Sequence, residues 1–82
     1  MDWDLISFIK RSEQRQIILR ALESPKTPKE MSKETKLAPS HISRTLKEFM
    51  EKGIAECLTP KQKTGRIYKL TEKGAKLLKE IS

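Results

Sequence analysis

Apolar residues occur along this chain in short groups whose spacing is that of a helix or a strand. Over residues 2–22, a continuous helix turning about 100° per residue would carry apolar faces on two opposite sides. One face holds Leu5, Phe8 and Ile9, and the other holds Ile17, Ile18, Ala21 and Leu22. Such a helix needs two packing partners. Either it breaks near Ser12, a favourable N-cap residue, or its first part packs on another surface, for which a dimer partner is the obvious candidate.

A short helix is predicted after this segment. Pro25 ends the preceding helix, because proline disfavours helical backbone in the residue before it. The motif "TPKE" at residues 27–30 has the order of a capping box, with threonine as N-cap, proline at the first helical position and glutamate reaching back. This helix is expected to end near Thr35 and to bury Met31.

The next helix has an unusual distribution of side chains. Pro39 suits its first position, and Gly53 suits the position just beyond its end, so it is predicted over residues 39–52. One side is apolar and is expected to be buried through Ile42, Leu46, Phe49 and Met50. The other side carries small hydrogen-bonding groups and two cations, namely Ser40, His41, Ser43, Arg44 and Lys47.

A β-hairpin and a last helix complete the pattern. "IAECL" (residues 54–58) and "RIYKL" (residues 66–70) alternate and are rich in strand formers. Between them lies a long basic tip, the wing (residues 59–66), closed by Gly65. Thr71 caps the last helix, which is predicted to turn Ala75, Leu78 and Ile81 inward. Gly74 is expected to pack closely against the hairpin.

This order of elements predicts the fold. A mostly α chain with a small β-hairpin, in the order helix-helix-helix-strand-strand-helix, is a winged helix-turn-helix. Residues 1–82 are expected to form one such domain, with residues 1–12 as an N-terminal helical extension. In this arrangement the third helix enters the major groove of DNA.

The polar side of the helix over residues 39–52 is therefore a candidate DNA-binding surface. Ser40 and Ser43 can donate to phosphate near the positive end of the helix. Arg44 can reach guanine with two hydrogen bonds, and Lys47 is better placed for the backbone. His41 can read a base or touch phosphate. A plain solvated helix surface is the alternative, and only the neighbouring elements argue against it.

The wing supplies the second candidate surface. Lys61, Lys63 and Arg66 lie at or beside its tip. A basic wing follows the sugar-phosphate backbone or inserts an arginine into the minor groove. Lys29 and Lys33 on the short helix are weaker candidates for flanking phosphates. A charged loop that serves only solubility is the alternative.

The distribution of charge agrees with a polyanionic partner. The net charge is +7, from 18 Lys and Arg against 11 Asp and Glu. Residues 1–25 hold four cations and four anions, whereas residues 26–82 hold fourteen cations and seven anions. Nucleic acid is the natural partner of such a segment. A Lys/Glu surface of the kind found in proteins from hot environments is the alternative.

Other classes of protein receive little support. Cys57 is the only cysteine and His41 the only histidine, so neither a disulfide nor a Cys/His metal site is expected. The longest apolar run, "IIL", is far too short to span a membrane. Asp2 and Asp4 have the wrong charge for a signal peptide, which predicts a cytoplasmic protein. No catalytic motif or cofactor-binding loop is present, so an enzyme is not expected.

Two segments carry a family resemblance. "HISRTLKEFMEKGIAECL" and "GRIYKLTEKG" resemble small archaeal winged-helix transcriptional regulators, close to the arsenic-repressor-like and multiple-antibiotic-resistance-repressor-like groups. The resemblance covers nearly the whole chain and implies operator binding by a homodimer. Lys36 departs from the glycine often found in the turn, where a left-handed lysine costs about 1 kcal/mol. Without Cys and His clusters, metal sensing is rejected.

Two further hypotheses remain open. A homodimer is expected to use Trp3, Leu5, Phe8 and Ile9; the alternative is a first helix folded back onto its own domain. The rival function is a winged helix for protein-protein contacts, or an accessory factor of transcription or replication machinery. Such a module usually places apolar residues where this chain is basic. Structured RNA is a third, weaker partner.

Overall fold

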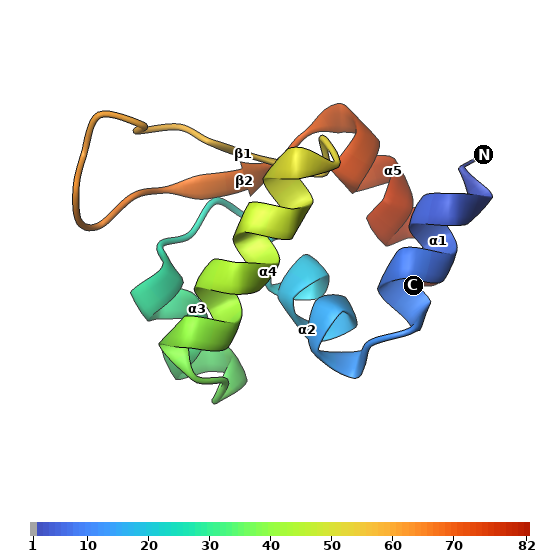
Figure 1. Cartoon of the computed structure of the whole chain (residues 1–82), viewed down its shortest axis with the longest axis horizontal. Helices are drawn as coiled ribbons and strands as arrows, with labels where there is room; N and C mark the ends of the chain where they lie inside the picture. Colours follow the sequence, from blue (N-terminus) through green and yellow to red (C-terminus); the bar gives the residue numbers. More distant parts are fainter. Residues whose placement is uncertain (1) are drawn as a thin grey trace.

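The computed structural model describes residues 2–82, so Met1 of the predicted extension lies outside it. The described residues form helices and one two-stranded antiparallel sheet (Figure 1). In chain order the elements are α1 (Trp3–Lys10), α2 (Glu13–Ala21), α3 (Pro28–Thr35), α4 (Pro39–Glu51), β1 (Ala55–Cys57), β2 (Tyr68–Leu70) and α5 (Glu72–Ile81). The predicted winged helix is confirmed, formed by α2 to α5 and preceded by α1.

The first apolar segment breaks into two helices at Ser12, which confirms one of the two alternatives. The Ser12 hydroxyl accepts a hydrogen bond from the Arg15 amide at 3.3 Å, so it caps α2. The break lets both apolar faces turn toward the same core. Leu5 and Ile9 from α1 are buried together with Ile18 and Leu19 from α2.

The core lies among all five helices, and two predictions of inward residues are wrong. Met50 is 39% exposed, because it lies beyond the edge of the stripe set by Ile42, Leu46 and Phe49, whereas Thr45 is buried at 6%. Ala75 is exposed. Gly74 and Leu77 are the buried positions of α5, since their three-residue spacing defines the inward side.

The sheet is shorter than predicted but has an extra connection. β1 and β2 pair through three residues each, with Cys57 opposite Tyr68. Lys26, between α2 and α3, adds an isolated bridge to the other edge of β2. Its amide donates to the Tyr68 carbonyl at 3.0 Å, and the Tyr68 amide donates back at 2.9 Å. The sequence analysis missed this bridge, which ties the start of α3 to the hairpin.

The start of α5 is hydrogen-bonded to the start of the hairpin and packs closely against it. The Thr71 hydroxyl accepts from the Gly74 amide at 3.1 Å, and the Thr71 amide donates to the Ile54 carbonyl at 3.0 Å. A Cβ atom added at Gly74 would lie 2.0 Å from the Ile54 carbonyl oxygen. The expected close packing of Gly74 is therefore confirmed, and glycine is required because backbone occupies the space.

We predict that Gly74→Ala destabilises the domain by about 1–3 kcal/mol, the usual cost of overpacking, because the helix or the hairpin must move. Urea unfolding followed by circular dichroism measures the change. The matched control is Ala75→Gly at the exposed neighbouring position, which costs only about 0.5–1 kcal/mol for helix entropy. A Gly74→Ala variant as stable as the wild type would contradict the packing described.

Candidate nucleic-acid interface

α4 is anchored through one side and exposed on the other. Pro39 occupies its first position, as the sequence analysis expected, and Ala38 before it provides no side-chain cap. Ile42, Leu46 and Phe49 are 0–2% exposed and fix the helix against the body. The helix crosses the front of the molecule in Figure 1 with no other element over it.

All five predicted residues of α4 are exposed: Ser40, His41, Ser43, Arg44 and Lys47. At about 100° per residue, Ser40, Arg44 and Lys47 fall within about 60° of one another and form the centre of the outer side. Ser43 and His41 lie on its two opposite flanks. The helix thus brings three of the five together in one row and places the other two on either side of it.

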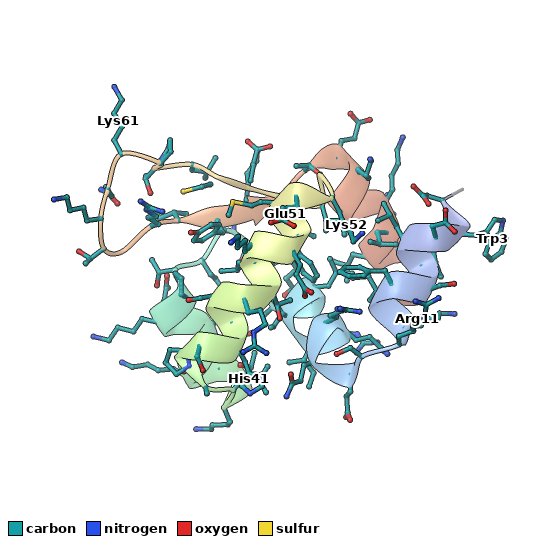
Figure 2. All side chains as sticks on the ribbon, in the orientation of Figure 1. Trp3, Arg11, His41, Glu51, Lys52 and Lys61 are labelled. Atoms are coloured by element: carbon teal, nitrogen blue, oxygen red, sulfur yellow. The ribbon has the colours of Figure 1, made fainter. Side chains whose placement is uncertain are left out.

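One acidic residue on this surface was missed in the sequence analysis. Glu51 is exposed at the last position of α4 (Figure 2). It follows Arg44 by seven residues, so it continues the same row. The helical period alone is enough to predict that Glu51 lies in this row. The cationic part of the surface is therefore confined to the N-terminal two thirds of α4.

The wing is a hydrogen-bonded loop on an extended base. Below it, the Leu58 amide donates to the Ile67 carbonyl at 2.7 Å. Inside it, the Thr59 hydroxyl accepts from the Ile67 amide at 3.0 Å, and Gly65 takes a left-handed φ of 66°. Figure 1 shows the wing projecting beyond α4, at the opposite end of the molecule from α1.

The three wing cations are all exposed, but they differ in their contacts. Lys61 points away from the body at the tip (Figure 2), and Lys63 lies two residues further on. The Arg66 Nε donates to the Gln62 carbonyl at 2.5 Å, which braces the loop from within. Arg66 thus has an internal role that the sequence analysis did not foresee, and this bond uses Nε rather than the two terminal nitrogens.

The turn before α4 fixes where that helix begins. Lys36 adopts a left-handed φ of 66°, as its place in the turn predicted. The Ser32 hydroxyl donates to the Leu37 carbonyl at 2.8 Å, and the Thr35 hydroxyl accepts from the Leu37 amide at 3.2 Å. These bonds stabilise a turn that lacks the usual glycine. Lys29, Lys33 and Lys36 are exposed along α3 and this turn.

The capping box of α3 is also confirmed. The Thr27 amide donates to the Glu30 carboxylate at 2.9 Å, and the Thr27 hydroxyl accepts from the Glu30 amide at 3.2 Å. Bonds from the Thr27 backbone and then its side chain lower the pKa of Glu30, with a smaller contribution from Lys26. The carboxylate is therefore held in its charged form and is engaged inside α3.

The four residues proposed for a dimer lie in different environments. Leu5 and Ile9 are 8% and 0% exposed and belong to the core of the protomer, as the alternative of a folded-back helix expects. Phe8 is half-buried, whereas Trp3 is 69% exposed. Of the four, only Trp3 presents a large free apolar surface. The dimer itself stays a prediction.

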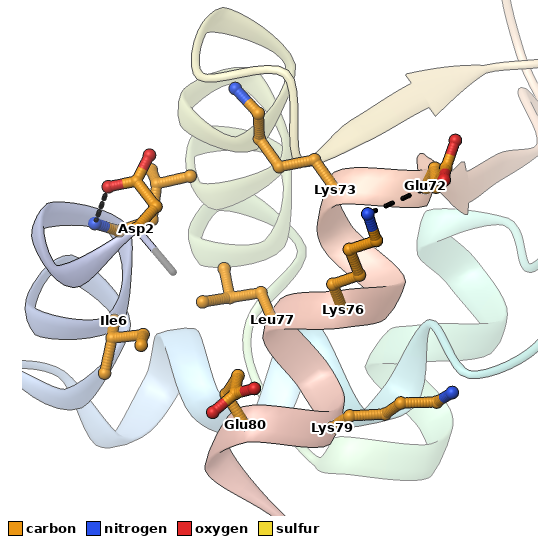
Figure 3. Close-up of a pocket in the computed structure, with 9 residues that line it drawn as sticks. Asp2, Ile6, Glu72, Lys73, Lys76, Leu77, Lys79 and Glu80 are labelled. Carbon is orange, nitrogen blue, oxygen red and sulfur yellow. Dashed lines mark hydrogen bonds and ion pairs between the residues drawn. The ribbon is translucent and has the colours of Figure 1, made fainter.

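A groove of about 700 Å³ lies between α1 and α5 (Figure 3). Its lining combines the apolar Leu5, Ile6 and Leu77 with charged residues of α5, among them Lys73 and Lys76. Lys76 pairs with Glu72 at 3.7 Å. The groove lies at the end of the molecule that also carries Trp3, away from the wing.

Two other kinds of site receive no support from the described chain. Within residues 2–82, no group of three or more His, Cys, Asp and Glu side chains is arranged to hold a metal ion. Cys57 is a half-buried free thiol on β1. Across the same residues, every helix is too short or too polar to cross a membrane.

Comparison with solved structures identifies the fold. A MarR family transcription regulator superposes with a TM-score of 0.76 at 22% identity over 95% of this chain. The reduced form of MarR from E. coli gives 0.78 at 25% identity over 94%. A cysteine-to-serine mutant of E. coli MarR in complex with operator DNA gives 0.69 at 23% identity over 94% of this chain and 68% of that chain.

The chain spans 58% and 59% of the length of the first two of these proteins. No protein-family model and no curated protein matches it. The chain is thus structurally similar to MarR winged-helix transcription regulators at low sequence identity. The multiple-antibiotic-resistance-repressor-like part of the resemblance agrees with these matches, whereas the archaeal part finds no support in them.

Proposed function

We propose that this chain binds duplex DNA as a transcription regulator, with α4 in the major groove and the wing on the backbone or in the minor groove. The observation that carries the proposal is the exposed row of Ser40, Arg44 and Lys47 on α4 beside a projecting basic wing. A structurally similar protein, the E. coli MarR mutant, is found with operator DNA, which supports the same partner here.

Each part of the surface has a distinct proposed role. Arg44 lies at the centre of the row and can contact guanine through two hydrogen bonds. Ser40 lies at the N-terminus of α4, where its hydroxyl and the positive end of the helix dipole suit a phosphate. Lys47, Lys61 and Lys63 provide cations for the backbone, and these contribute affinity rather than sequence preference. Ser43 and His41 extend the contact to either side, and the terminal nitrogens of Arg66 can reach a phosphate.

Glu51 limits how far α4 enters the groove. A carboxylate at the C-terminal end of the row is repelled by phosphate, so the helix is expected to approach DNA with its N-terminal end. This orientation also places the α3 lysines toward the flanking backbone. The rival function as a protein-protein module needs an apolar surface here, and the row itself has none.

We further propose that the protein acts as a homodimer joined at the end formed by α1 and α5. Trp3 is an exposed indole on α1, the helix that forms one wall of the groove of apolar and charged residues against α5. A large exposed aromatic side chain is typical of an interface. Because the N-terminal half of α4 and the wing lie away from this end (Figure 1), two protomers can present two such surfaces to one duplex.

The wild-type chain is expected to bind mixed-sequence duplex DNA at low salt, with affinity that falls steeply as salt rises. For about five phosphate contacts, the slope of log K against log salt is about −4 to −5. Fluorescence anisotropy of a labelled duplex measures both quantities. Matched single-stranded DNA and duplex RNA serve as controls, and the absence of any duplex binding at low salt removes the proposal.

Arg44→Ala is expected to weaken a selected site about fivefold to 150-fold more than random DNA, because it removes a base contact. Lys61→Ala and Lys63→Ala should weaken both duplexes alike and make the salt slope less steep by about 1 each. Arg20→Ala, at an exposed position of α2, is the control for lost charge. Selection from a random duplex pool provides the site. Equal losses from all three changes would remove base reading from Arg44.

Sedimentation velocity is expected to show a dimer for the wild type and a monomer for Trp3→Ser, since the change deletes the largest exposed apolar side chain at the proposed interface. Leu58→Ser, which removes a 45% exposed side chain at the base of the wing, should leave the dimer intact. A wild-type chain that stays monomeric at the highest attainable concentration would refute this part of the proposal.

A further inference from the structure

Three helices meet at the side chain of Arg15 on α2. Its guanidinium lies 3.8 Å from the centre of the Phe8 ring on α1. Nη1 donates to the Phe8 carbonyl at 2.9 Å, and Nη2 donates to the Glu48 carboxylate on α4 at 3.3 Å. From the far end of α4, the Lys52 ammonium lies 4.8 Å from the same ring. Phe8 also meets Phe49 edge to face, with ring centres 6.4 Å apart.

The bond to Phe8 completes the C-terminus of α1. The last four carbonyls of a helix have no partner within it, and here each finds one. The Arg11 amide donates to Ser7 and the Ser12 amide to Ile9. The Lys10 carbonyl accepts from the Gln16 side chain at 3.4 Å, and that of Phe8 accepts from Arg15. Arg15 therefore holds α1 through one nitrogen and α4 through another.

This contact reaches α4 close to the proposed base-reading residue. Glu48 lies one turn beyond Arg44 on the same helix, and its side chain is 35% exposed against 24% for Arg15. The ion pair contacts α4 on a side of the helix that does not carry the apolar stripe of Ile42, Leu46 and Phe49. It also neutralises a carboxylate that would otherwise repel phosphate beside the DNA-binding row.

We infer that Arg15 is a positioning residue for DNA recognition: by bridging the Phe8 carbonyl and the Glu48 carboxylate, it sets the orientation of α4 in which Arg44 meets the bases. The inference rests on the proposed function. Arginine is required because its rigid fork serves both acceptors while it stacks on the ring, whereas lysine is a point charge without that geometry.

The test uses Arg15→Lys, which keeps the charge and removes the fork. The preference for the selected site over random duplex is expected to fall roughly fivefold to tenfold, with the salt slope unchanged. Arg20→Lys, an exposed arginine on the same helix, should alter neither quantity. Binding is measured at a temperature where circular dichroism shows each variant fully folded. Full preference retained by Arg15→Lys would overturn the inference.

A double-mutant cycle with Glu48→Gln separates positioning from direct contact. If Arg15 acts through Glu48, the double variant loses no more preference than Arg15→Lys alone. If the losses add, the two residues act independently and the inference is overturned. Arg15→Gln tests whether Arg15 instead contacts phosphate directly. In that case Arg15→Gln would bind both duplexes equally weakly and with a flatter salt slope, whereas Glu48→Gln would bind like the wild type. This result would also overturn the inference.

Hydrogen exchange provides a measurement that does not need DNA. Arg15→Lys should speed exchange of the amides in the C-terminal half of α4 relative to those of α5. If the wild type binds no duplex, the proposed function is lost, and faster exchange in α4 alone would still support the positioning of that helix. Unchanged exchange throughout α4 would overturn it.

Discussion

The burial of one side of α4 is the contact on which the other features of the molecule depend. Ile42, Leu46 and Phe49 are 0–2% exposed, and burial of each such side chain contributes about 1.5–3 kcal/mol. That is a large share of the stability of a small domain. Because these three residues hold one side of the helix against the body, they also determine which side of it faces outward. The row of Ser40, Arg44 and Lys47 is exposed as a consequence of core packing, without any interaction among its own members.

The position of the wing relative to α4 depends on uncharged contacts. The Ile54 side chain is fully buried just after α4 ends, and its carbonyl accepts from Thr71 at the start of α5. Lys26 then pairs through its backbone with Tyr68 on the far side of the hairpin. The cations of the wing take no part in these bonds. The charges of Lys61 and Lys63 can therefore serve a partner, while backbone bonds and the Arg66 side chain hold the loop.

Features set by neighbouring residues could be predicted from the sequence, and features set by distant residues could not. The caps at Ser12, Thr27 and Thr71 depend on local side-chain chemistry, and all three are confirmed. The prediction for Met50 was wrong because an apolar residue at the edge of a helical stripe is buried only where another element packs over it, and the sequence does not show where that happens. The Lys26 bridge and the contact between Arg15 and Glu48 join segments 42 and 33 residues apart, and no sequence period indicates such pairs. The outer row of α4 followed from the helical period, whereas the bracing role of Arg66 depends on a loop conformation that sequence does not specify.

The way in which the acidic residues are paired distinguishes a DNA-binding surface from a merely soluble one. In a Lys/Glu surface that serves stability, cations and anions pair with each other across the surface. Here three of the four carboxylates of α3 and α4 have internal partners: Glu30 bonds to its own helix start, Glu34 pairs with Lys26, and Glu48 pairs with Arg15. The fourth, Glu51, is exposed at the end of α4. Across residues 2–82, by contrast, no ion pair involves Arg44, Lys47, Lys61 or Lys63. Because Glu34 and Glu48 are paired with cations away from the outer row and wing, the positive charge is concentrated at the N-terminal part of α4 and at the wing. A surface with this distribution of charge favours a polyanion, and its shape, a projecting wing beside an exposed helix, supports the proposal that the polyanion is duplex DNA.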